Sequence, residues 1–65
     1  MRIPTKAVWV QKRCIILDDV FAVRGDPLEI HGQYSNGGSY IVKGIRFDSY
    51  FWVKPEDIEI TEYKL

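Results

Sequence analysis

The side chains best suited to catalysis are few in this sequence and stand apart from one another. There is one histidine, His31, and one cysteine, Cys14, too few for a zinc site with the usual number of Cys and His ligands. Asp18 and Asp19 are adjacent, so an extended chain would point their carboxylates to opposite sides, which suits neither a metal site nor a proton-sharing pair. The sequence therefore predicts a protein that is not an enzyme and needs no cofactor or metal.

Two glycine-containing segments look like binding motifs but are better explained as turns. Residues 36–39, Asn-Gly-Gly-Ser, could approach a phosphate, but neither a helix start nor a lysine follows them, and Asn-Gly is typical of a hairpin tip. Arg24-Gly25-Asp26 spells the integrin-binding tripeptide, yet Pro27 follows and the four residues are typical of a turn. We therefore assign neither segment to a ligand.

The composition is that of an ordinary small globular domain. The 65 residues are 46% hydrophobic and 28% charged, and nine basic side chains balance nine acidic ones. Proteins that coat nucleic acid usually carry a basic excess, because they bind by neutralising phosphates. Zero net charge therefore weighs against that class, although Arg2, Lys6, Lys12 and Arg13 precede the first acid.

The sequence also bears on compartment and domain number. No stretch approaches the roughly 20 apolar residues of a membrane span, and no hydrophobic signal-peptide region follows the first residues. A single cysteine excludes an internal disulfide framework. We expect one complete domain over residues 1–65, without a membrane partner, in the cytoplasm, or in the host cytoplasm if a phage encodes it.

Hydrophobic alternation predicts an all-β chain, since no window sustains a helical period between proper caps. Strands are expected at residues 6–11, 14–17, 20–23, 28–34, 40–45, 51–53 and 58–60, with a short 3₁₀ turn at 55–57. Turn residues at such short spacing are typical of a small sandwich or barrel. A single glycine at Gly44 predicts a bulge or a close backbone approach within its strand. We expect a barrel of five to six antiparallel strands.

Alternation also assigns side chains to the two faces of each strand. Phe51 and Val53 are expected to face the core, which leaves Tyr50 and Trp52 outside. The full predicted core is Val8, Val10, Ile16, Leu28, Ile30, Ile41, Phe51, Val53, Ile58 and Ile60. Trp9 and Tyr40 then fall on the outer face, and the alternative is that some of these rings cap the ends of the barrel.

Two segments resemble the Src homology 3 (SH3) family. Residues 23–30, VRGDPLEI, are similar to the stretch after that family's long first loop, and residues 52–60, WVKPEDIEI, to its last strands and 3₁₀ turn. The resemblance implies an SH3-like barrel over about residues 6–60. The proline-peptide groove is not implied, because Ser39-Tyr40 stands at the paired-tryptophan site and the last turn lacks a tyrosine. What remains is similar to bacterial and phage SH3-like modules, including small antirepressors that cover the DNA-reading face of a repressor.

Exposed tryptophan and tyrosine dominate binding hot spots, so the outer aromatic residues are the predicted contact surface. That surface consists of Trp9, Tyr40, Tyr50 and Trp52, with a basic rim of Lys6, Lys12, Lys43, Arg46 and Lys54. We expect a protein-binding module that regulates or inhibits a larger cytoplasmic enzyme or transcription factor, in a phage or prophage setting. The alternatives are a nucleic-acid-binding barrel, in which the aromatics stack on bases, and a structural subunit that assembles through its sheet edges.

Overall fold

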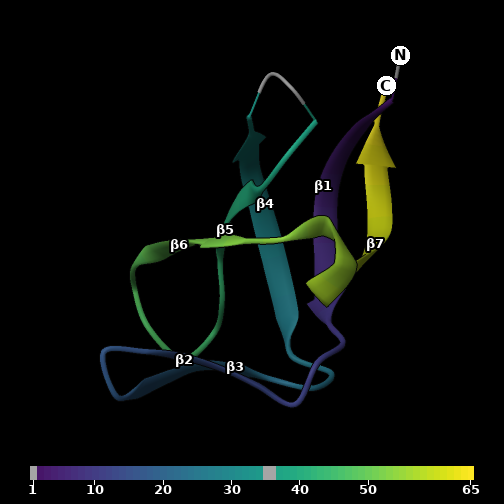
Figure 1. The fold of residues 1–65 in the computed structure, drawn as a ribbon. Coiled ribbons are helices and arrows are strands. Elements are labelled where there is room, and N and C mark those ends of the chain that lie inside the picture. The colour runs from purple at the N-terminus through teal and green to yellow at the C-terminus, as the bar shows by residue number, and fades with distance from the viewer. Residues whose placement is uncertain (1, 35–36) are drawn as a thin grey trace.

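The computed structural model describes residues 2–34 and 37–65, which form strands joined by short turns (Figure 1). The elements are β1 (Ile3–Trp9), β2 (Arg13–Ile16), β3 (Asp19–Val23), β4 (Pro27–Gln33), β5 (Tyr40–Lys43), β6 (Tyr50–Val53), the 3₁₀ turn η1 (Pro55–Asp57) and β7 (Ile58–Lys64). The all-β class and the short 3₁₀ turn near the C-terminus are confirmed. The predicted hairpin tip at residues 36–39 lies partly outside the described residues.

The strands form two antiparallel sheets. Five of them pair in the order β6-β5-β4-β1-β7, and β2 and β3 form a separate two-stranded hairpin. β1 and β7 run side by side along their length, which brings the two termini together at one end, while the β2–β3 hairpin lies at the other (Figure 1). The larger sheet has five strands, the lower of the two numbers predicted for the barrel. Strands β6 and β7 form its two edges.

The core contains side chains from both sheets, most of them from the larger one, and confirms part of the predicted set. Leu28, Phe51, Val53 and Ile58 are buried, and Ile16, Ile30 and Ile60 pack partly buried against them. The core also contains Ala22 of β3, which is fully buried and was not predicted.

The predicted faces of β1 and β5 are wrong. Ala7 and Trp9 are buried in β1, whereas Val8 and Val10 are only half-buried. In β5 the buried residues are Tyr40 and Val42, and Ile41 lies on the opposite face. Both strands carry apolar side chains on both faces, so alternation alone could not decide which face turns inward.

Two turns owe their shape to residues in the left-handed region. Leu17 and Asp18, with φ of 51° and 69°, form the tip of the β2–β3 hairpin, and Gly25, with φ of 90°, precedes β4. Positive φ at both central residues is the geometry of a tight hairpin turn that favours Asn and Gly, so Leu17 is an unusual choice. The close approach predicted at Gly44 is confirmed, because a Cβ there would lie 3.3 Å from the Phe21 carbonyl oxygen.

Candidate protein-binding surface

The outer side of β6 carries two exposed aromatic rings. Tyr50 and Trp52 are 55% and 48% exposed, while Phe51 and Val53, which alternate with them, are buried. Tyr50 lies opposite Lys43 of β5, and Trp52 lies opposite Ile41. The alternation predicted for this strand is therefore confirmed, and both rings stand on the surface of the sheet.

His31 of β4 and Tyr34, which directly follows β4, extend this surface. The Tyr34 ring stacks on Trp52, with centroids 4.5 Å apart and an interplanar angle of 7°, and Tyr34 is 56% exposed. The His31 ring meets Tyr50 edge-on, with centroids 4.9 Å apart. We call His31, Tyr34, Ile41, Tyr50 and Trp52 the aromatic face.

Sequence reasoning missed Tyr34 because a bulge interrupts β4. Ile30 lies opposite Val42, but Gly32 already lies opposite Ile41, so β4 has one extra residue at this point. That residue reverses the alternation and turns Tyr34 to the outer face, although strict parity from Ile30 would place it inside. The signal in the sequence was Gly32, because a glycine inside a strand often marks a bulge or a close approach. In the structure, a Cβ at this position would come within 3.2 Å of Ile41 Cγ2.

The other two predicted aromatic residues do not belong to this surface. Trp9 is 5% exposed and Tyr40 is 9% exposed, so both are core side chains. Their predicted position on the contact surface is therefore wrong, and the physical reason is the reversed facing of β1 and β5. The alternative, that some of these rings cap the ends of a barrel, stays a prediction, since the structure shows Trp9 and Tyr40 as members of the core cluster.

Two of the predicted rim lysines are paired with acids. Lys43 Nζ lies 2.6 Å from Asp48 Oδ1 and 5.8 Å from the centroid of the Tyr50 ring. The hydrogen bond between Lys43 and Asp48 raises the pKa of the lysine and lowers that of the aspartate. Lys6 Nζ lies 3.5 Å from Glu62 Oε2, and both side chains are mostly exposed.

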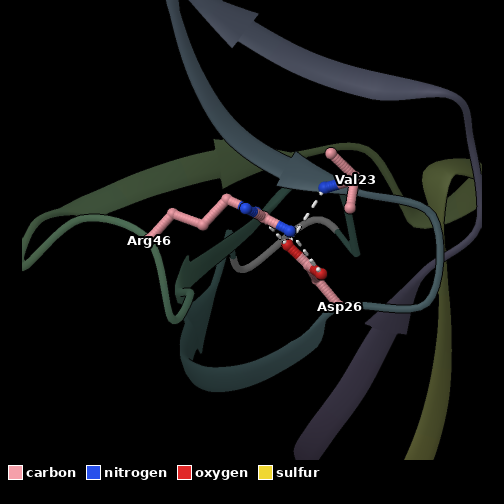
Figure 2. A network of polar contacts seen from close by, with 3 residues as sticks. All are labelled: Val23, Asp26 and Arg46. Carbon is pink, nitrogen blue, oxygen red and sulfur yellow. Dashed lines mark hydrogen bonds and ion pairs between the residues drawn. The ribbon is translucent and has the colours of Figure 1, made fainter.

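Arg46 has a structural role instead of a place on the rim. Its Nε donates to Asp26 Oδ2 at 2.6 Å and its Nη2 to Oδ1 at 3.2 Å, while the Val23 backbone N–H donates to Oδ2 (Figure 2). Asp26 is 7% exposed. Chiefly through the hydrogen bond from Arg46, the pKa of Asp26 lies below its ordinary value of 3.8, so the buried carboxylate stays charged. The pair ties the loop after β5 to the turn before β4.

The two remaining rim lysines, Lys12 and Lys54, are exposed, and neither forms an ion pair within residues 2–34 and 37–65. Lys12 lies between β1 and β2, and Lys54 directly precedes η1. Of the five residues of the predicted basic rim, three are thus paired with acids and two are not paired within the described residues.

A hollow of about 470 Å³ next to Lys43 has little net charge of its own. Lys6 and Lys43 line it together with Glu29 and Glu62, and Pro27 and Ile45 are among its apolar walls. Two bases opposite two acids give no field that would draw a polyanion to this part of the sheet.

The remaining reactive side chains stand apart in the structure. Cys14 is half-buried, and burial, assisted by the nearby charge of Asp57, raises the pKa of its thiol. His31 Nε2 lies 3.3 Å from Glu29 Oε1 on the exposed outer side. Within the described part of the chain, no three His, Cys, Asp or Glu side chains are grouped to hold a metal ion, and no helix is long and apolar enough to span a membrane.

Comparisons with protein-family models, with curated proteins and with solved structures find no match to this chain.

Proposed function

We propose that this protein is a non-enzymatic protein-binding module and that the aromatic face contacts its partner. The observation that carries this is the pairing of four rings on one side of β4 and β6, two of them stacked, each ring exposed to solvent. Rings held in place by one another lose little conformational freedom when a partner covers them, which favours binding hot spots. Ile41 adds an apolar centre opposite Trp52.

We also propose a finer description of the fold and a role for the protein. A strand, a hairpin, three strands, a 3₁₀ turn and a last strand, in that order, support an SH3-like barrel as the finer description. A domain of 7.6 kDa that gathers four exposed rings on one side of β4 and β6 is suited to covering a site on a larger molecule. We therefore propose that it regulates or inhibits a larger cytoplasmic enzyme or transcription factor, with a phage origin as the corresponding setting.

The test compares variants of the face with a matched surface aromatic elsewhere. Immobilised wild type, Tyr34→Ser/Trp52→Ser and Tyr63→Ser are exposed to lysate of the organism that encodes the chain. Tyr63 is the control, because it is 46% exposed but lies on β7. A partner retained by wild type and Tyr63→Ser should be lost by the double variant.

The partner is then purified and titrated by calorimetry. Trp52→Ala should weaken its affinity by about tenfold or more, as hot-spot truncations do. Equal affinity of wild type and the double variant would remove the aromatic face from the proposal.

Nucleic-acid binding is the second candidate, because a stacked Tyr34–Trp52 pair could also continue into stacked bases. Salt dependence separates the two candidates, since each phosphate contact adds about −0.7 to −0.9 to the slope of log affinity against log salt. The neutralised lysines favour a protein partner. We therefore expect that this chain shows no measurable binding of random oligonucleotides at physiological salt. Micromolar binding with a slope steeper than about −3 would instead favour nucleic acid.

A further inference from the structure

Strand β6 has a backbone edge that no other strand covers. It is the first strand in the sheet order and pairs with β5 alone. Because an antiparallel ladder uses alternate residues for each neighbour, half of its N–H and C=O groups face away from β5. Among residues 2–34 and 37–65, no loop or turn backbone hydrogen bond involves a residue of β6.

The opposite edge of the same sheet is built differently. β7 carries Glu59, Glu62 and Lys64, and its pairing with β1 has register shifts near Lys6. Charges and irregular register are the means by which proteins keep sheet edges from pairing. β6 reads Tyr-Phe-Trp-Val, without a charge, and its pairing with β5 is regular. The unprotected edge is thus β6.

We propose that β6 pairs with β6 of a second copy of this chain, antiparallel and centred on Phe51, to form a dimer with a continuous ten-stranded sheet. Directly opposite residues in a ladder share a face, so a symmetric pairing must match positions of equal parity. Centring on Phe51 places Tyr50 of each copy opposite Trp52 of the other. Cross-strand aromatic pairs of this kind stabilise sheets.

The charges that flank β6 fit a second copy in this register. The same symmetry brings Lys54 of one copy toward Asp48 of the other, at both ends of the paired strands. Lys54 is exposed without an ion pair among the described residues. Asp48 pairs with Lys43 of its own copy at 2.6 Å, but its side chain is still 92% exposed and can accept from a second lysine. The chain has no net charge, so two copies do not repel each other overall. This self-complementarity is the reason to choose a second copy over an unrelated extended segment.

The pairing uses the backbone edge of β6 and shares Tyr50 and Trp52 with the aromatic face, but self-association has its own readout. Sedimentation velocity of the full chain over a concentration series should show reversible association to twice the 7.6 kDa mass. Lys54→Glu should raise the dissociation constant roughly two- to thirtyfold, since two symmetry-related charge pairs become repulsive. Lys12→Glu is the matched control and should leave it unchanged. A chain that stays monomeric up to millimolar concentration would overturn the proposal.

Cross-linking tests the register. Tyr50→Cys and Trp52→Cys chains, both with Cys14→Ser, are oxidised separately and as a mixture. Opposite residues lie about 4.5–5.5 Å apart at Cα, within disulfide range, whereas diagonal neighbours lie about 7–8 Å apart. Covalent dimers should form mainly in the mixture.

Two other results would each contradict the proposed pairing. Covalent dimers from Trp52→Cys alone would place the centre at residue 52. Cross-links between Tyr50→Cys and Thr61→Cys chains, together with species larger than a dimer, would show that β6 pairs with β7 of another copy.

Discussion

Trp9 and Trp52 occupy opposite environments in one small sheet. Trp9 lies in β1, which is paired on both sides, and is 5% exposed, whereas Trp52 lies in the edge strand β6 and is 48% exposed. The first packs with the core and the second stacks on Tyr34. The comparison separates a ring that stabilises the fold from a ring that remains available to a partner.

The two N–H groups of Trp9 differ in their hydrogen bonding. The indole Nε1 of Trp9 is buried and has no hydrogen-bond partner among residues 2–34 and 37–65, although its backbone N–H donates to the Asp26 carbonyl oxygen at 3.0 Å. A buried donor without a partner reduces the net gain from burying the ring. Trp9 therefore contributes through its apolar surface, and its strand end is held by the turn at Asp26.

The largest effect is expected from Trp9→Ala. Removing a buried aromatic side chain costs about 3–5 kcal/mol, which is comparable to the whole stability of a chain of this length. Urea denaturation followed by circular dichroism should show an unfolded or barely folded protein. Val8→Ala, on the half-buried opposite face of β1, is the control and should unfold cooperatively. A free energy of unfolding within about 1 kcal/mol of wild type for Trp9→Ala would contradict the inward position of Trp9 in β1.

Sequence alone could place β6 but not β1, and the reason lies in the contrast between their faces. In β6 the inward pair, Phe51 and Val53, continues into the apolar positions of β7. The sequence pattern therefore indicated which face of β6 turns toward the core. In β1 the alternatives were Ala7 and Trp9 against Val8 and Val10, two apolar pairs of which the first is buried. The β2–β3 hairpin decides between them, because it adds Ala22 to the side on which Trp9 lies.

The candidate surface was predicted only where the strand was regular. Tyr50 and Trp52 followed from alternation, but the one-residue bulge in β4 moved Tyr34 to their side. The ion pairs could not be foreseen either, since Arg46 and Asp26 are 20 residues apart and meet only in the folded chain.

Asp26→Asn tests the turn that holds the end of β1. Loss of a buried charged acceptor should cost about 1.5–3 kcal/mol at neutral pH, measured by urea denaturation. Because the folded pKa of Asp26 lies below its unfolded value, this contribution is complete above the unfolded pKa and is lost as pH falls through the folded one. The difference between wild type and variant should therefore shrink below about pH 4. A difference that is constant down to pH 2 would contradict the role of the charge.

Gly32→Ala tests the bulge that brings Tyr34 to Trp52. A Cβ at this position would lie 3.2 Å from Ile41 Cγ2, so the isoleucine, which lies opposite Trp52, must shift. We expect a loss of about 1 kcal/mol by denaturation and a changed tryptophan emission. Gly37→Ala is not an equivalent control, because φ there is 79°. Ile41→Leu/Gly32→Ala should restore part of the loss, because leucine lacks the Cγ2 branch that the new Cβ would meet. An unchanged emission spectrum would separate the bulge from the aromatic face.

The smallest effect on stability is expected from Trp52→Ala, although it should have the largest effect on partner binding. About half of the ring is already in solvent, so truncation removes the stack on Tyr34 and part of the contact with Ile41 but opens no cavity in the core. Stacked aromatic pairs contribute about 0.5–1.5 kcal/mol beyond buried area, and one at the surface belongs at the low end. A double-mutant cycle of Trp52→Ala and Tyr34→Ala, followed by urea denaturation, should give a coupling energy below about 1 kcal/mol. A loss above about 3 kcal/mol for Trp52→Ala would make this ring part of the core, and the contrast with Trp9 would fail.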